Sequence, residues 1–429
     1  MKKVLVLGMK ASGHSAVALL TKKGIEVRRY DDNLEFSDNW KSRRSEALNS
    51  LDGVCVSPGV PNNHELIIEA KARKIQIFSE LELGINSLDS NIIMITGTNG
   101  KTTTVDMVER GLMLAGMKCK AMGNIGYPVS QVALDNVIYD HAIIEASSFQ
   151  LEHVKKIKAN IAVVLNLAPD HIDRYKGFTE YINAKKNIFL NQDENDHAIL
   201  NYDLKQTREL VKATKAKPIF VSTRTIIGDF NLANDAFYFN KDKLVNFREC
   251  RIKGEHNRFN MLVALNILHL LGCTRSDYVK LIKEYKTLPH RVEYVSTING
   301  KRFYNDSKGT NIAACTAAIN LLSGAKIGLI LGGSDKREDF CDFFDQMSKD
   351  VKHVVVTGAN DVKIIGAAMK VGFQEIEIAK DLNIAVSKLI QMNNIDTILF
   401  SPACASFDRF SSYQERGDRF KELVYGLKA

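Results

Sequence analysis

The stretch Ile92-Ile93-Met94-Ile95-Thr96-Gly97-Thr98-Asn99-Gly100-Lys101-Thr102-Thr103-Thr104 decides the fold. It opens with an apolar run of strand length and continues into a short loop with two glycines and a lysine. A segment of helical period follows, with apolar residues at Val105, Val108 and Leu112. The order strand, glycine loop, helix is typical of a phosphate-binding loop.

The residue types in this loop suit a nucleotide. Backbone N–H groups in a tight glycine loop, together with the positive end of the helix dipole, bind phosphate. Lys101 adds a positive charge for the terminal phosphates, and the Thr102 hydroxyl is a ligand for Mg²⁺. The strict pattern has glycine where Ile95 stands, so this loop is a shortened variant. The alternative, a glycine turn that happens to precede a lysine, is disfavoured by the flanking strand and helix.

Length and composition indicate a multidomain protein. At about 150 residues per domain, 429 residues predict three domains, and 45% hydrophobic residues are enough for real cores. Polar residues at 86–91 predict a linker, and Leu288-Pro289-His290-Arg291 marks a second break. We therefore expect domains at 1–90, 91–288 and 289–429.

The net charge and the cysteine content indicate which kind of partner the protein binds and in which compartment it is found. The 58 Lys and Arg residues against 50 Asp and Glu residues give a net charge of +8, but the basic residues are scattered. This favours small acidic substrates over nucleic acid. The seven cysteines form no C-x-x-C pair, so neither a disulfide framework nor a zinc site is indicated. No apolar run is long enough for a signal peptide or a spanning helix, and we expect a cytoplasmic protein without membrane insertion.

The first domain begins as a dinucleotide-binding unit would. A strand at 4–7, a turn at 8–13 and a helix from Ala16 are expected, but Lys10 replaces the second glycine of the fingerprint, which disfavours NAD. Asp31 and Asp32 end the second strand, where an acid usually meets a ribose or base; the alternative for Asp31 is a solvated strand end. A third strand precedes Ser57-Pro58-Gly59, at an edge where such sheets bind ligands.

The middle of the chain carries further candidates at strand ends. Glu145 follows a strand at 142–144, a position suited to Mg²⁺. His171, flanked by acids, follows a strand at 161–167 and suits a metal ligand or a base. From composition alone, Lys185 in a helix at 181–189 is a surface lysine. Asn257, ahead of a helix expected after Asn260, either caps that helix or contacts an adenine edge.

The last domain repeats the alternation of strands and helices. Polar segments at 305–311, 332–336 and 401–408 each follow an apolar strand, which predicts one ligand-binding rim of a parallel sheet. Cys404 lies in the last segment and is either a nucleophile or a small buried thiol; its apolar neighbours favour the thiol.

These motifs together resemble the Mur ligase family, ATP-dependent enzymes that add amino acids to the UDP-linked precursor of bacterial peptidoglycan. The matching segments are T-G-T-N-G-K-T-T at 96–103, G-x-H-N-x-x-N at 254–260, H-R at 290–291 and N-D-S-K-x-T-N at 305–311. The resemblance implies an α/β fold of three domains: a Rossmann-like N-terminal domain, a central P-loop ATPase domain with a mostly parallel sheet, and a Rossmann-like C-terminal domain.

Narrower matches resemble the members that add D-glutamate to UDP-N-acetylmuramoyl-L-alanine through an acyl phosphate. They are A-S-S-F-Q-L-E at 146–152, D-H-x-D-R-Y at 170–175 and S-P-A-C-A-S-F-D at 401–408. Two alternatives stay open: a ligase of the same fold that uses another amino acid or extends folate, and a nucleotide-dependent regulator without ligase activity. The resemblance also leads us to expect a monomer.

The resemblance implies a role for each matching residue. The ATP phosphates would contact Gly97, Thr98, Asn99, Gly100, Lys101, Thr102 and Thr103, and the nucleoside would contact Asn257, Arg291 and Asp306. The ligands of Mg²⁺ would be Thr102, Glu145, His171 and a carbamylated Lys185; Lys101, His171 and Lys185 would be catalytic. The UDP-linked substrate would contact Ser12, Asp31, Asp32, Ser57, Pro58, Gly59, Asn124 and Ser147. D-Glutamate would contact Lys308, Thr310, Lys336, Ser406, Phe407 and Tyr413.

Overall fold

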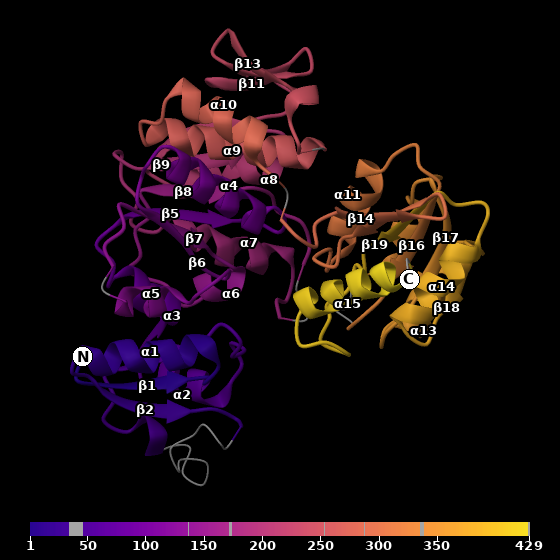
Figure 1. Cartoon of the computed structure of the whole chain (residues 1–429). Coiled ribbons are helices and arrows are strands. Elements are labelled where there is room, and N and C mark those ends of the chain that lie inside the picture. Colours follow the sequence, from indigo (N-terminus) through magenta and orange to yellow (C-terminus); the bar gives the residue numbers. More distant parts are fainter. Residues whose placement is uncertain are drawn as a thin grey trace. The chain divides into compact units, whose positions relative to one another are not determined.

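The computed structural model describes residues 1–33, 46–135, 137–170, 174–252, 254–286, 288–334 and 339–427 (Figure 1). Contacts divide the chain into two compact units. The first comprises 1–167, 177–251 and 255–285, and the second comprises 168–176, 252–254 and 286–429. The sheets are mostly parallel and covered by helices, which confirms the α/β class. The three expected domain boundaries stay predictions.

The N-terminal sheet is entirely parallel. Its strand order is β2 (Glu26–Tyr30), β1 (Lys3–Leu7), β3 (Gly53–Val56) and β4 (Gln76–Ser79). Its helices are α1 (Ala11–Lys22), α2 (Glu65–Ala72) and α3 (Glu80–Ile85). Val4 and Val6 pack on one face of β1, and Leu5 and Leu7 pack on the other. Burial on both faces explains why this strand is an unbroken apolar run.

The first helix begins earlier than predicted. We expected a turn at 8–13 and a helix from Ala16, whereas α1 begins at Ala11. Gly13 therefore lies inside the helix, where an added Cβ would come within 1.9 Å of the Gly8 carbonyl oxygen. This glycine allows close packing of the helix on the loop rather than forming a turn.

The central sheet is also parallel. Its order is β10 (Lys217–Val221), β9 (His197–Asn201), β8 (Ile161–Val164), β5 (Asn91–Thr96), β7 (His141–Glu145) and β6 (Cys119–Gly123). Its helices are α4 (Lys101–Leu114), α5 (Val129–Leu134), α6 (Ser148–Leu151), α7 (Phe178–Lys186), α8 (Lys205–Glu209), α9 (Glu255–Leu270) and α10 (Arg275–Glu284). Helices α4 and α9 pack side by side (Figure 1). The strand expected at 161–167 ends at Val164, and the helix expected at 181–189 gives way to a 3₁₀ turn from Asn187.

The expected start of α9 is wrong. The helix begins at Glu255, so Asn257 and Asn260 lie within its first two turns. Asn257 therefore does not cap the helix, and this alternative is corrected. The polar first turn interrupts the apolar periodicity and conceals the true start.

A small antiparallel sheet was not predicted. It consists of β11 (Phe230–Ala233), β12 (Ala236–Phe239) and β13 (Asp242–Asn246). Asn234 and Asp235 join the first two strands with φ of 45° and 53°, the left-handed conformation that a two-residue hairpin requires and that these residue types tolerate.

The C-terminal sheet has one antiparallel edge. Its order is β14 (Glu293–Ile298), β15 (Lys301–Asn305), β19 (Thr397–Phe400), β16 (Ile327–Leu331), β17 (Val351–Val356) and β18 (Ile376–Ile378), with only β14 antiparallel to its neighbour. Its helices are α11 (Ile312–Leu321), α12 (Phe340–Asp345), α13 (Asp361–Lys370), α14 (Leu382–Gln391) and α15 (Tyr413–Gly426). Two apolar cores lie on its opposite faces.

The cysteines are reduced. All seven thiols are free, and Cys404 is buried with its Sγ 3.7 Å from Asn360 Nδ2. The buried-thiol interpretation of Cys404 is confirmed. Within the part of the chain that the structure describes, no helix combines the length and apolar character needed to cross a bilayer.

Candidate active site

The glycine loop connects β5 to α4, as predicted. Gly100 adopts a left-handed conformation with φ of 85° immediately before the helix. An added Cβ would lie 2.8 Å from Asn260 Oδ1, so both conformation and space require glycine here. Thr102 and Thr103 lie buried in the first turn of α4, where helix N–H groups have no partner within the helix.

The Lys101 side chain folds over this loop. Its Nζ donates to the carbonyl oxygens of Gly97 at 2.7 Å and Thr98 at 2.8 Å. The ammonium is thereby positioned over the loop rather than extended into solvent. An anion on the loop would meet a cation already in place.

Lys185 is not the surface lysine that composition alone indicated. It is 1% exposed on α7, and its Nζ donates to Thr96 Oγ1 at 3.2 Å and to the Gly97 carbonyl oxygen at 3.0 Å. The ammonium also lies 4.8 Å from the centre of the Tyr181 ring. The structure therefore brings Lys185 directly against the glycine loop.

Glu145 ends β7, the neighbour of β5, and is 2% exposed. Its Oε1 accepts a hydrogen bond from Asn124 Nδ2 at 2.8 Å. Its Oε2 is buried and has no hydrogen-bond partner among the described residues. A buried carboxylate oxygen without a donor is costly, and a cation is the natural partner. In the described part of the chain, no three His, Cys, Asp or Glu side chains gather around a metal position; His171 lies outside the described residues.

Two further side chains shape the loop and were not predicted. Asn166 accepts from the Asn99 N–H at 2.9 Å and donates to the Asn99 carbonyl oxygen at 3.0 Å. The hydroxyls of Tyr181 and Thr98 are 3.0 Å apart. Asn166 follows a strand beside β5, so its place at a parallel strand end was the available signal.

The N-terminal sheet brings its predicted residues to one edge. Asp31 Oδ2 accepts from the Met9 N–H at 2.5 Å, and the Ser57 hydroxyl donates to the Gly8 carbonyl oxygen at 2.7 Å. Ser12 lies in the first turn of α1, and Asp32 Oδ2 is 3.5 Å from His64 Nε2. Pro58 is half-buried and Gly59 is exposed beside them. The loops after β1, β2 and β3 therefore form a common edge.

Ser147 and Asn124 belong to the neighbouring loops of the central sheet. Ser147 caps α6, forming a capping box with Gln150. Asn124 follows β6 and hydrogen-bonds to the Glu145 carboxylate and, through its N–H, to the Glu145 carbonyl oxygen. Both residues thus lie next to the end of β7 that carries Glu145.

In the second unit, Asp306 is buried at the end of β15. Its Oδ2 accepts from Ser401 Oγ at 2.6 Å, and its Oδ1 accepts from the Val292 N–H at 3.2 Å. Burial raises the pKa of Asp306 to about 7, although Ser401 and Arg291 oppose this rise. The carboxyl is therefore partly protonated near neutral pH.

Asp306→Asn is expected to flatten the pH dependence of stability. Between pH 4 and 7 the folded state keeps a proton that the unfolded state releases, so this carboxyl lowers stability as pH rises. A pKa raised from 3.8 to about 7 corresponds to a loss on the order of 4 kcal/mol. Urea unfolding followed by circular dichroism at pH 5 and 8 should show a smaller fall in the midpoint for Asp306→Asn. Equal falls in both proteins would contradict this assignment.

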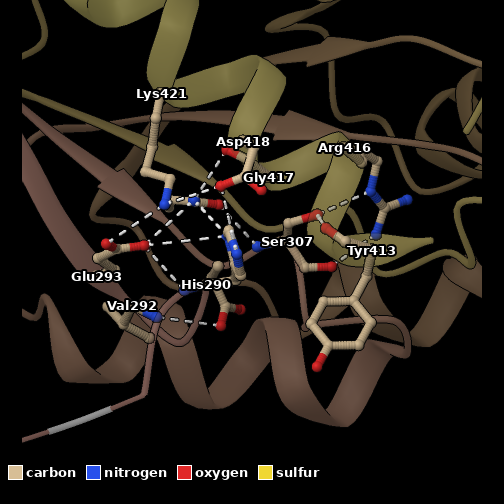
Figure 2. Close-up of polar contacts among 11 residues, drawn as sticks. His290, Val292, Glu293, Ser307, Tyr413, Arg416, Gly417, Asp418 and Lys421 are labelled. Atoms are coloured by element: carbon tan, nitrogen blue, oxygen red, sulfur yellow. Dashed lines mark hydrogen bonds and ion pairs between the residues drawn. The ribbon is translucent and has the colours of Figure 1, made fainter.

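His290 and Arg291 precede β14 in an unusual backbone. His290 and Val292 have φ of 63° and 47°, so Arg291 lies between two left-handed residues. Figure 2 shows His290 among Glu293, Asp418 and Lys421. Burial is the main cause that lowers the pKa of His290, and Lys421 adds to it. The Nδ1 atom of the ring lies 2.9 Å from Asn305 Nδ2.

Arg416 on α15 organises the rim beside these residues and was not predicted as a site residue. It is 3% exposed, and its guanidinium donates to Ser307 Oγ and the Ser307 carbonyl oxygen (Figure 2). It also donates to the carbonyl oxygens of Cys404 and Ala405, and all four distances are 2.7–3.1 Å. Burial lowers its pKa to about 10, so it stays charged at neutral pH. One cation thus joins the loops after β15 and β19.

The remaining predicted residues of this rim divide into three groups. Lys308 Nζ lies 4.0 Å from the centre of the Tyr413 ring, and Thr310 lies in the same loop as Lys308. Ser406 is buried, whereas Phe407 is 76% exposed. Lys336 lies outside the described residues.

Two family models match the chain over most of the central and C-terminal sheets. The Mur ligase middle domain matches residues 95–268, and the Mur ligase glutamate ligase domain matches residues 290–404. The chain belongs to the Mur ligase family. The resemblance stated from its motifs is thereby confirmed, and the whole length of this Mur ligase is covered by curated relatives.

Two relatives carry the same name. The UDP-N-acetylmuramoylalanine--D-glutamate ligase of Alkaliphilus metalliredigens is 35% identical over 449 residues, covering 100% of this chain and 98% of the relative. That of Caldanaerobacter subterraneus is 36% identical over 445 residues, covering 100% and 99%. Among solved structures, MurF ligase from Thermotoga maritima in complex with ADP has a TM-score of 0.62 at 16% identity, covering 99% of this chain and 95% of that one. This likeness confirms the three-domain fold class.

Proposed function

We propose that this Mur ligase joins D-glutamate to UDP-N-acetylmuramoyl-L-alanine and cleaves ATP to ADP and phosphate. The observation that carries the chemistry is Glu145 Oε2, a buried carboxylate oxygen without a described partner at the strand end beside the glycine loop. The full-length relatives named above support the choice of both substrates.

The glycine loop, residues 97–103, is the proposed site of the ATP phosphates. The Lys101 ammonium already lies over the carbonyl oxygens of the loop, and it would shift from them to contact the terminal phosphates. On the nucleoside side we propose Asn257, Arg291 and Asp306. ADP bound to a structural neighbour of the same fold is consistent with this use of the loop.

The residues at this edge fit Mg²⁺. We propose Thr102, Glu145, His171 and a carbamylated Lys185 as its ligands, because these residue types supply oxygen and nitrogen donors and Glu145 Oε2 is buried without a described partner. Carbamylation joins Nζ of the ammonium to the carbon of CO₂, with loss of two protons, and so replaces a cation by an anion. Bound Mg²⁺ would neutralise charge on the phosphoryl oxygens.

The proposed reaction has two steps. The substrate carboxylate oxygen attacks the γ-phosphorus, the bond to the bridging oxygen of ADP breaks, and an acyl phosphate forms. The amine of D-glutamate then attacks the acyl carbon, phosphate leaves, and a base takes the amine proton. His171 fits either that base or a metal ligand, and both alternatives stay open.

Two groups of residues are proposed for the other substrates. The UDP-linked substrate would contact Ser12, Asp31, Asp32, Ser57, Pro58, Gly59, Asn124 and Ser147. D-Glutamate would contact Lys308, Thr310, Lys336, Ser406, Phe407 and Tyr413, since cations and hydroxyls suit its two carboxylates. We also propose that the enzyme acts as a monomer in the cytoplasm, where free cysteines such as these persist.

A substrate panel tests this function. The protein is mixed with Mg²⁺, ATP and UDP-N-acetylmuramoyl-L-alanine, and phosphate release is measured with D-glutamate, L-glutamate, L-lysine or meso-diaminopimelate. Release with D-glutamate alone is the expected result. Release with another amino acid would replace the proposed substrate, and no release in any mixture would overturn ligation. With ¹⁸O in the substrate carboxylate, label in the released phosphate is expected from the acyl phosphate route.

A further inference from the structure

Helix α3 carries two buried acids that none of the roles above uses. It follows β4 directly, and Glu80 and Glu82 are 0% and 3% exposed. The helix packs against α5 and α6 of the central sheet (Figure 1). Buried carboxylates are rare unless they are paired, so their partners indicate what they do.

Glu80 binds the start of α5. Its Oε1 accepts from Ser130 N at 2.8 Å and from Ser130 Oγ at 2.6 Å. Gly84 lies one turn further along the same face, and an added Cβ there would come within 2.7 Å of Ser130 N. The two helices therefore touch without room for an intervening side chain. Burial raises the pKa of Glu80, whereas the two hydrogen bonds from Ser130 oppose this rise because they stabilise the ionised form.

Glu82 binds the segment after α6. Its Oε2 accepts from the backbone N–H groups of Lys155 and Lys156, the second at 2.9 Å. Beside this contact, Ser79 N donates to the His153 carbonyl oxygen at 2.8 Å. A carboxylate that accepts two backbone donors forms charge-assisted bonds, which are shorter and stronger than neutral ones.

The segments held by these acids also carry proposed substrate contacts. Asn124 lies on the loop that leads into α5, and Ser147 caps α6. Asp31 and Ser57 lie on the N-terminal sheet, from which α3 extends. A sugar nucleotide that contacts both the N-terminal sheet and the loops of the central sheet spans the contact that α3 makes between them. Its affinity therefore depends on how firmly α3 holds the two sheets at one spacing.

We infer that Glu80 and Glu82 are positioning residues that fix the spacing between the edge of the N-terminal sheet that carries Asp31 and Ser57 and the loops bearing Asn124 and Ser147. This inference rests on the proposed function. A fixed spacing lets one ligand engage both sites without paying to align them. A ligand that occupies the N-terminal edge alone gains nothing from the spacing.

That difference supplies the test. Wild-type protein, Glu80→Ala and Glu82→Ala are titrated calorimetrically with UDP and, separately, with UDP-N-acetylmuramoyl-L-alanine. We expect the variants to bind UDP within twofold of wild type and to bind the complete sugar nucleotide at least about tenfold more weakly. Glu82→Gln keeps one acceptor oxygen, so its affinity for the sugar nucleotide should fall between those of wild type and Glu82→Ala. This variant replaces Glu82→Ala in the test if Glu82→Ala does not fold.

Asp203→Asn is the matched control. Asp203 also accepts a backbone N–H, that of Thr223 at 3.0 Å, but it lies within the central sheet's own loops. It should leave both affinities unchanged. Unchanged binding of the sugar nucleotide by Glu82→Ala and Glu82→Gln, or an equal loss for UDP, would overturn the inference. If wild-type protein binds neither ligand, it is the proposed function that fails.

Steady-state kinetics separate positioning from general destabilisation. Glu82→Ala should raise KM for the sugar nucleotide about tenfold while changing KM for ATP by less than twofold. Equal increases in both KM values would indicate a structural role only and would contradict positioning.

Discussion

Lys101→Met is expected to lower kcat for ATP cleavage by about 10³-fold, the largest effect of any single change considered. The methionine side chain has similar length and fills the same space, but it carries no charge. The ammonium that now bonds the Gly97 and Thr98 carbonyl oxygens would be missing when charge develops on the phosphoryl oxygens. Single-turnover phosphate release with all substrates present measures the loss.

The unfolding midpoint is the control for Lys101→Met. The side chain is half-buried, so the variant should unfold within a few degrees of wild type. If the variant folds normally and keeps more than a tenth of the wild-type kcat, the proposed catalytic role of Lys101 is wrong.

Glu145→Gln is expected to raise the Mg²⁺ concentration needed for half-maximal rate by about 10–100-fold. The glutamine oxygen can still accept the Asn124 bond, so the fold of the loop is kept. The second oxygen, which has no described partner, becomes an N–H₂ group that cannot ligate a cation. Rate measured against free Mg²⁺ should recover in part at high concentration.

Glu109→Gln is the matched control for Glu145→Gln. Glu109 lies on α4, a helix of the central sheet, and its Oε1 accepts from the Ala121 N–H. Its Mg²⁺ dependence should match that of wild type. If Glu145→Gln showed the same Mg²⁺ curve as Glu109→Gln, the proposed metal position would be wrong.

Much of the fold was predictable because its elements are formed by residues that are consecutive in the sequence. The glycine loop was recognisable because its strand, loop and helix are consecutive, and because β5 is an apolar run that is buried on both faces. The place of Glu145 at a strand end beside the loop was predictable for the same reason, since a parallel sheet brings strand ends to one edge. The small sheet at β11–β13 was missed, although Asn234-Asp235 is a hairpin signal.

What was missed depends on partners distant in sequence. Glu80 and Glu82 were assigned no role from the sequence, and the donors that they bind are 50 and 73 residues away. Composition alone indicated a surface residue at Lys185, and only the resemblance singled it out; its burial depends on contacts with Thr96 and Gly97. Single-sequence periodicity reports which residues are apolar, whereas a buried ion depends on the groups that surround it.

The position of Arg416 has a consequence for biosynthesis. Its guanidinium bonds loops that follow β15 and β19, but it emerges from the ribosome after every strand of that sheet. Those loops therefore complete their hydrogen bonding only once α15 has been translated. A nascent chain halted before residue 413 should show protease-sensitive sites at 306–310 and 402–406 that the longer chain protects.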